Sequence, residues 1–342
     1  MAGGELQDII YMVLLLFSLF ACVVMHELGH SLAARRYGIG TKDITLLPIG
    51  GMARLEKIPE NPVEELVVAA AGPLVNVVIA IILMPIVLFV APPQFEAMEG
   101  PAFVGPENFL FFLMSMNIFL VIFNMIPAFP MDGGRIFRAV LGFWYGHAHA
   151  TKIAARVGQF FAVLFFVAAF HPAVSPILIL IAIFVFFASH AESNYVQTKH
   201  ALSGYVVRDV MMQNFTLLEK DEPVSQAVDI LLKGSEQEFV VVDENRRIAG
   251  VLNRNDIIQG LSESGRSAKL EGLMHKNVTV FRVDTPIEQA YHHMSQSGLS
   301  ISPVVDENGN IIGVVDRDNI FEFIWIQDAL EARRKIKERL EQ

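Results

Sequence analysis

The 342-residue chain has little charge, few basic residues and almost no cysteine. Charged residues make up 18% of it, and its 26 Lys and Arg are outnumbered by 36 Asp and Glu. With no concentrated basic stripe, this balance argues against nucleic acid as a partner. The single cysteine, Cys22, rules out an intramolecular disulfide framework. Residues 1–8 carry no positive charge, so we expect the apolar run that follows to be a retained span and not a cleaved signal peptide.

Apolar residues, in contrast, are abundant and unevenly placed. They make up 53% of the chain, and the mean hydropathy is +0.45, which is too apolar for an ordinary soluble protein. The excess ends near Ser189, beyond which the composition is that of a soluble domain. The sequence therefore predicts an α-helical polytopic membrane domain over residues 1–195, in the lipid bilayer. Its about five spans are expected at residues 9–35, 66–91, 109–126, 153–170 and 176–189.

The basic residues of the loops predict the orientation of these spans. Positive charge follows spans one and three and returns from Lys199 onward, whereas residues 92–108 and 171–175 have none. Because positive loops stay in the cytoplasm, we expect the N-terminus outside and the soluble part in the cytoplasm. The protein is thus expected to be an integral protein of a prokaryotic cell membrane.

A five-residue motif, H-E-L-G-H at residues 26–30, lies at the end of the first span. His26 and His30 are four apart, so on a helix they project from one face and can hold one Zn²⁺, with Glu27 as the base. If the helix ends at a C-cap Gly38, Glu27 lies about 12 Å inward from Arg35, where an ionisable group is costly and by default functional. The alternative is a pair of histidines hydrogen-bonded to neighbouring helices.

A third ligand is expected after the third span. Pro127 and Pro130 stop that helix, and Asp132 follows directly. Two histidines and an aspartate leave one position open for water, as a catalytic zinc site requires. Zinc lowers the pKa of such a water to about 7, so Glu27 can take its proton and later return it to the leaving amine. The alternative for Asp132 is an N-cap of a helix that begins near Arg135.

Residues 44–54 predict a hairpin in which a Pro48 and Gly50-Gly51 turn separates two apolar strands. Such a hairpin can offer an open edge to an extended peptide, or it can be a packed connector under the membrane. In the second span, Asn76 follows Gly72-Pro73, a pattern that by itself is most often a packing feature.

Taken together, these motifs resemble the site-2 protease family of intramembrane zinc metalloproteases. The resemblance implies His26, His30 and Asp132 as ligands of one zinc ion per chain, Glu27 as the base and Asn124 as a helper near the site. It also implies the hairpin, with Pro48, Gly50 and Gly51, as a substrate contact, to which we add Asn76. Relatives often have a further span before the motif-bearing helix, which is not seen here.

The soluble part is an internal repeat with an offset of 63 residues. Pro223 matches Pro286, and the run V-V-D-E-N at residues 241–245 recurs at residues 304–308. The repeat resembles an α/β tandem CBS pair, expected at residues 205–263 and 268–326, and the resemblance implies adenine nucleotide binding or a structural, dimerising role. At the nucleotide-binding positions, hydroxyls are missing and the candidates are Asn253, Asp256, Asp316 and Asn319.

Beyond the repeat, residues 327–342 predict a charged helix that extends the last CBS helix or pairs with a second subunit in a homodimer. The sequence as a whole predicts an intramembrane zinc endopeptidase that cuts a transmembrane protein substrate near the cytoplasmic face. The alternative from another class is a divalent-cation transporter or channel with CBS regulation. An inactive relative that only binds membrane segments is a third interpretation.

Overall fold

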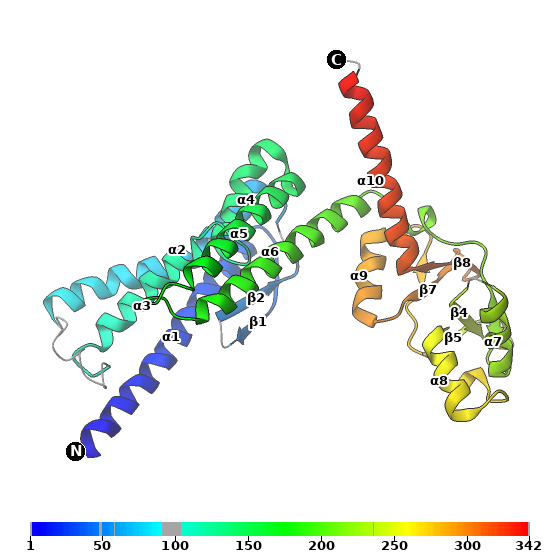
Figure 1. Cartoon of the computed structure of the whole chain (residues 1–342), viewed down its shortest axis with the longest axis horizontal. Helices are drawn as coiled ribbons and strands as arrows, with labels where there is room; N and C mark the ends of the chain where they lie inside the picture. The colour runs from blue at the N-terminus through cyan, green and yellow to red at the C-terminus, as the bar shows by residue number, and fades with distance from the viewer. Residues whose placement is uncertain (1, 48–49, 58, 91–103, 235, 341–342) are drawn as a thin grey trace. The chain divides into compact units, whose positions relative to one another are not determined.

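The computed structural model describes residues 2–47, 50–57, 59–90, 104–234 and 236–340, and it forms two compact units (Figure 1). The first unit, Met1–Val196, contains the helices α1 to α5, most of α6 and a β-hairpin, and we call it the membrane unit. The second, Gln197–Gln342, contains two small sheets with their helices, and we call it the soluble unit.

Helices dominate the membrane unit. Within the described residues, four helices are long and apolar enough to cross a membrane, and α3 is a shorter apolar helix, so the predicted helical membrane domain is confirmed. The helices are α1 (Ala2–Arg36), α2 (Pro62–Phe89), α3 (Phe109–Asn124), α4 (Asp132–Tyr145), α5 (His147–Ala168) and α6 (Ile177–Leu202).

The motif-bearing helix α1 ends where the sequence predicts. It stops at Arg36, and Gly38 has a φ of 72°, a left-handed conformation that glycine adopts without strain. Two strands follow, β1 (Thr41–Leu47) and β2 (Gly50–Leu55), paired antiparallel with Leu46 opposite Gly51. The predicted hairpin is therefore present, although its Pro48 lies outside the described residues.

Helix α2 is the centre of the membrane unit, because it contacts α1, α3 and α4. At the crossing with α1, a Cβ added to Gly29 would lie 2.8 Å from the carbonyl oxygen of Ala71 and from Val75 Cγ2, so only glycine lets the two backbones come this close. This approach brings the motif of α1 directly against the middle of α2.

A fully buried arginine ties α4 to two other helices. The guanidinium of Arg138 bonds Glu65 of α2, with Nε 2.7 Å from Oε1, and Glu192 of α6, with Nη1 2.5 Å from Oε1. It also lies 5.0 Å above the ring of Phe129. Because a buried charge needs such partners, these contacts hold the first turns of α4 in a fixed place.

In the soluble unit, each copy of the repeat forms a three-stranded sheet, and the α/β CBS fold class is confirmed. Copy one contains β3 (Leu217–Glu219), α7 (Val224–Lys233), β4 (Glu238–Val242), β5 (Ile248–Asn253) and α8 (Arg254–Ser264). Copy two contains β6 (Phe281–Arg282), α9 (Ile287–Ser297), β7 (Ile301–Val305), β8 (Ile311–Asp316) and α10 (Arg317–Leu340). Helix α10 continues into the charged tail, which therefore extends the last helix of the repeat.

The two copies are joined by reciprocal backbone bonds. Met212 of copy one, ahead of β3, pairs with Val314 of β8 in copy two, and His275 of copy two, ahead of β6, pairs with Val251 of β5 in copy one. A shared apolar cluster that includes Val240 and Val314 lies between the sheets. The soluble unit is thus one body with approximate twofold repetition.

Candidate metal centre

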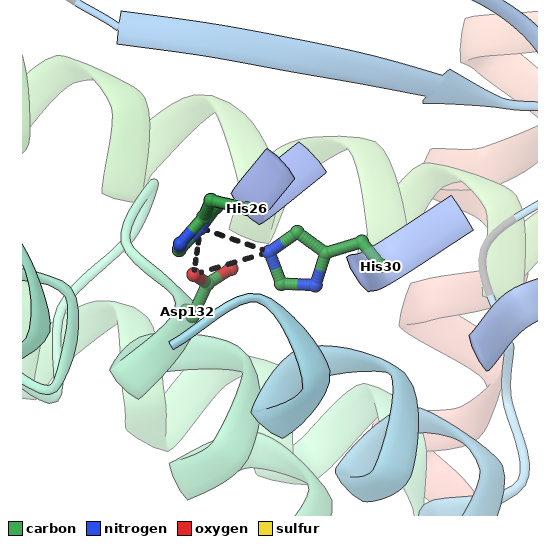
Figure 2. A group of neighbouring side chains, drawn as sticks. All are labelled: His26, His30 and Asp132. Atoms are coloured by element: carbon green, nitrogen blue, oxygen red, sulfur yellow. Dashed lines mark hydrogen bonds and ion pairs between the residues drawn. The ribbon is translucent and has the colours of Figure 1, made fainter. Parts of the chain in front are cut away.

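Three predicted ligands come together at the crossing of α1, α2 and α4. Figure 2 shows the rings of His26 and His30 and the carboxylate of Asp132 pointing toward one another. Asp132 Oδ2 lies 3.1 Å from His26 Nε2 and 3.3 Å from His30 Nε2, and the two ring nitrogens are 3.2 Å apart. All three residues are buried. Among the described residues, they form the group of His, Cys, Asp or Glu side chains whose ligand atoms lie within 4.8 Å of one another.

The spacing of these atoms fits a zinc ion. Ligand atoms about 2.0 Å from a tetrahedral zinc lie about 3.3 Å from one another. The three edges of the triangle, 3.1, 3.2 and 3.3 Å, match that value. Three protein ligands also leave the fourth tetrahedral position for water, which is the arrangement of a catalytic zinc site.

The outer nitrogens of both rings are engaged. His30 Nδ1 lies 2.7 Å from the carbonyl oxygen of Val68, an obligatory acceptor, so this nitrogen carries the proton and Nε2 keeps its lone pair. His26 Nδ1 lies 2.7 Å from Asn76 Oδ1. With both Nε2 lone pairs and a carboxylate oxygen facing one another, a cation is the group that makes this arrangement favourable.

Helix α2 provides the space for these rings through Gly72. A Cβ added there would lie 2.7 Å from His26 Nε2 and would also collide with His30 Nε2. Any side chain at position 72 would therefore occupy the volume where the ligand nitrogens meet. This is a reason for the glycine of the Gly72-Pro73 pair that the sequence pattern alone did not reveal.

The predicted base Glu27 is buried and lies under the hairpin. A Cβ added to Gly51 of β2 would be 2.7 Å from Glu27 Cγ and 3.1 Å from Glu27 Oε1. The backbone of β2 therefore passes directly over the carboxylate. A glycine at this position lets an extended strand approach the reacting groups.

Asp132 is the first residue of α4, and Met131 occupies the N-cap position without a side-chain cap bond. The carboxylate of Asp132 faces the two histidines, so Asp132 does not act as the N-cap of this helix. The next residue, Gly133, packs so closely on the carbonyl groups of Met125 and Ile126 that a side chain would not fit. The turn between α3 and α4 is therefore packed tightly enough to hold Asp132 in place.

The remaining predicted site residues are placed as follows. Asn124 is the last residue of α3 and is half-buried, and its helper role stays a prediction. Gly50 begins β2, and the substrate contacts predicted for Gly50, Gly51 and Asn76 stay predictions as well. The amide of Asn76 is fully buried and bonds both His26 and a second amide, Asn117 of α3, with Asn76 Nδ2 2.9 Å from Asn117 Oδ1.

Asn117 is a site residue that the sequence analysis missed. An amide inside an apolar run of 16 residues needs a partner, and this signal was available in the third span. What the sequence could not reveal is the partner, because Asn76 and His26 lie 41 and 91 positions away on other helices.

In the soluble unit, the four nucleotide-binding candidates act at helix starts. Asn253 is the N-cap of α8 and accepts from the backbone N–H of Asp256, while Asp256 accepts from the N–H of Asn253 and lies 3.1 Å from His275 Nε2. Asp316 accepts from the N–H of Asn319 at 2.6 Å. Nucleotide binding by this unit stays a prediction.

Comparison with known proteins places these features in one class, membrane metalloproteases that carry a CBS pair. The chain matches peptidase family M50 over residues 14–168 and the CBS domain over residues 207–263 and 270–326. Zinc metalloprotease MJ0392 of Methanocaldococcus jannaschii is 32% identical over 333 residues, which cover 97% of this chain and 90% of that protein. The chain therefore belongs to peptidase family M50, and the resemblance seen in the sequence is confirmed.

The chain is also similar to two further proteins. The protein sll0528 of Synechocystis sp. is 27% identical over 317 residues, covering 89% of this chain and 80% of that protein. Among solved structures, the site-2 protease from Methanocaldococcus jannaschii is 37% identical, covers 55% of this chain and 88% of that chain, and has a TM-score of 0.41.

Proposed function

We propose that this protein is an intramembrane zinc endopeptidase that cleaves a membrane-anchored protein near the cytoplasmic face. The observation that carries the proposal is that Asp132 of α4 converges with His26 and His30 of α1, a helix long and apolar enough to span a membrane. Membership of peptidase family M50 supports the metalloprotease chemistry.

The surroundings of the motif support cleavage inside the bilayer. On α1, Leu28 and Leu32 are 42% and 65% exposed, so the outer face of the helix is apolar beside the buried ligands. Glu27 and Arg35 are eight positions apart, which is about 12 Å along a helix. The basic residues after α1 support a cytoplasmic location for that end of α1 and for the soluble unit.

Each residue of the site has a role in this chemistry. When bound, zinc activates a water molecule and polarises the scissile carbonyl. Glu27 takes the proton from the attacking water and delivers it to the leaving amine, which suits a carboxylate enclosed beside the ligands. His26, His30 and Asp132 hold the metal, and the enclosure excludes other water from the reacting atoms.

The hairpin supports a mode of substrate binding. A helical substrate must unwind before it is cut, because its carbonyl groups are otherwise engaged in the helix and inaccessible. Adding the unwound segment as a strand to the hairpin edge at residues 44–47 replaces the lost backbone bonds. Since β2 passes over Glu27 and pairs with β1, a segment added at this edge joins the sheet that lies over the base.

The alternative of a divalent-cation transporter or channel is less well supported. Permeation needs weak and exchangeable ligands, whereas two imidazoles and a carboxylate at zinc spacing bind the ion tightly. We therefore rank transport below proteolysis.

The experiment uses the full chain reconstituted in lipid vesicles with a designed single-span peptide. The peptide carries a Gly-Pro pair near its cytoplasmic end, and the matched control peptide has Leu-Ala instead. We expect cleavage of the first peptide within the span, located by mass spectrometry, and much slower cleavage of the control. Cleavage confined to segments outside the span would contradict the intramembrane proposal.

Two variants assign the roles. Glu27→Gln is expected to keep about one zinc per chain but to lose cleavage by at least about 100-fold, since general acid-base catalysis contributes 10²–10⁴-fold. Asp132→Ala is expected to lose or weaken the zinc itself, measured by elemental analysis. A Glu27→Gln protein that cuts at the wild-type rate, or zinc that is indifferent to Asp132→Ala, would contradict these roles.

A further inference from the structure

A series of buried hydrogen bonds leads from the metal ligand His26 into a third helix. The imidazole ring of His26 is hydrogen-bonded to Asn76 of α2, and Asn76 is hydrogen-bonded to Asn117 of α3. We propose that Asn117, acting through Asn76, is a positioning residue that fixes which nitrogen of His26 carries the proton. The proposal rests on the metal site of the proposed function and adds to it a residue outside the motifs of the sequence.

The direction of these hydrogen bonds is set at their far end. Asn117 Nδ2 lies 2.8 Å from the carbonyl oxygen of Leu113, which can only accept. The nitrogen of the Asn117 amide must therefore face Leu113, where it also lies 3.4 Å from the sulfur of Cys22. The oxygen of the same amide then faces Asn76.

The same reasoning applies to Asn76 and then to the metal ligand His26. Because Asn117 Oδ1 only accepts, Asn76 must present its nitrogen to Asn117 and its oxygen to His26 Nδ1, 2.7 Å away. An oxygen that accepts requires a donor, so His26 Nδ1 carries the proton. A neutral imidazole has one N–H, and His26 Nε2 is therefore left with the lone pair that faces Asp132.

Burial makes this assignment stable. Asn76 and Asn117 are 0% exposed, so water cannot replace a partner if either amide turns over. An amide also does not titrate in the range where proteins are stable, and it adds no charge beside the metal. The two amides thus fix the proton position and orientation of His26, as a carboxylate often does for a zinc-binding histidine, but they add no negative charge.

The second histidine ligand has no such dependence. His30 Nδ1 faces the backbone carbonyl of Val68, which no substitution removes. Only His26 relies on side chains from two other helices for its proton position. A substitution of Asn117 is therefore expected to change the proton position of His26 and to leave that of His30 as it is.

The first test is the zinc affinity of the full chain in detergent, measured by competition with a chromophoric chelator. Asn117→Leu fills the same volume but removes the acceptor for Asn76. The Asn76 amide can then turn and offer its nitrogen to His26 Nδ1, which moves the ring proton to the ligand nitrogen. Loss of such a second contact typically weakens metal binding about 10- to 100-fold, and we expect a change in that range.

The decisive variant is the double substitution Asn76→Asp with Asn117→Leu. A carboxylate has no donor end to turn toward the ring, so it keeps the proton on His26 Nδ1 whatever stands at position 117. We expect Asn117→Leu to have little effect in the Asn76→Asp background. In the metal-free protein, ¹⁵N shifts of the histidine rings are expected to show the His26 proton on Nδ1 in wild type and shifted toward Nε2 in Asn117→Leu.

Two other variants serve as controls. Asn117→Asp keeps an oxygen that accepts from the Asn76 nitrogen and is expected to keep near wild-type affinity. Ser115→Ala changes α3 outside the hydrogen-bonded series and is expected to leave zinc affinity unchanged. If Asn117→Leu does not yield folded protein, Asn117→Asp still tests the proposal, since loss of zinc there would overturn it.

The outcomes separate this proposal from the one it rests on. Wild-type protein that binds no zinc would overturn both the metal site and the role of Asn117. Zinc binding that is normal in Asn117→Leu, or weakened equally in both Asn76 backgrounds, would overturn the role of Asn117 alone and leave the metal site in place.

Discussion

In the membrane unit, polar side chains from α1, α2, α3 and α4 form hydrogen bonds with one another across helices. In the soluble unit, the residues predicted to bind a nucleotide form hydrogen bonds mostly with the backbone of their own helices. His26 contacts Asp132 and Asn76, which lie 106 and 50 positions away. Asn253 and Asp256, in contrast, satisfy each other's backbone groups three positions apart.

From this contrast it follows which of the two arrangements needs a ligand. At the metal centre, two ring nitrogens and a carboxylate oxygen face one another, and a cation resolves their repulsion. The caps of α8 and α10 are already satisfied by backbone N–H groups and need nothing further. Polar residues at the positions of a family motif are therefore strong evidence for a ligand-binding site when their lone pairs face one another. They are weaker evidence when the same residues cap a helix.

The largest effect that can test this comparison is expected for Gly72→Ala. The added Cβ would lie 2.7 Å from His26 Nε2, and neither ring can move away, because Asn76 and Val68 hold their outer nitrogens. We expect zinc to fall from about one per chain to a small fraction of that, measured by elemental analysis. Gly142→Ala on α4 is the control, since its Cβ would meet the side chain of Pro62 at the start of α2 and not the ligand rings. A Gly72→Ala protein with full zinc would refute the proposed packing.

A smaller effect is expected for Asn253→Ala in the soluble unit. Loss of an N-cap costs about 1 kcal/mol, so the first turn of α8 should exchange its amide hydrogens roughly five times faster. Asn253→Ser keeps a capping oxygen and is expected to exchange like wild type. Hydrogen exchange of the full chain, followed by mass spectrometry, measures both, and equal exchange in all three proteins would mean that the cap contributes nothing.

The smallest effect is a pH dependence of the soluble unit. Burial, together with the carboxylates of Asp316 and Asp318, raises the pKa of Glu238 at the start of β4. The folded state therefore binds this proton more tightly than the unfolded state does. Its contribution to stability is present below the usual glutamate pKa of about 4.3 and is lost as the pH rises through the raised value.

Glu238→Gln should remove this part of the pH dependence. We expect amide exchange in β4, corrected for its intrinsic pH dependence, to be slower in the variant than in wild type at pH 7.5 and similar near pH 4.5. Asp229→Asn, on helix α7 of the same copy, is the matched change of charge and is expected to leave the profile as it is. A wild-type profile that is flat over this range would contradict the assignment to Glu238.

Much of this architecture was predictable from local pattern. The i, i+4 spacing of His26 and His30 sets their common face on any helix, and the 63-residue offset required two equivalent sheets. The end of α1 near Gly38 and the hairpin after it followed from glycine and proline positions. The relation between Asn253 and the start of α8 is equally local, but its use as a cap competes with its use as a ligand contact, and the sequence did not decide between them.

The helices, the strands and the pair of histidines could thus be inferred from the sequence because they depend on residues a few positions apart, and the repeat because its two copies match residue by residue. The packing of the helices and the hairpin set the rest: Asp132 Oδ2 comes within 3.1 Å of His26 Nε2, Gly72 leaves the space between the rings free, and β2 passes over Glu27. It also decided the partner of Asn117. A buried amide needs some partner, but which one it finds depends on how helices cross, and that is set by close packing along their whole length.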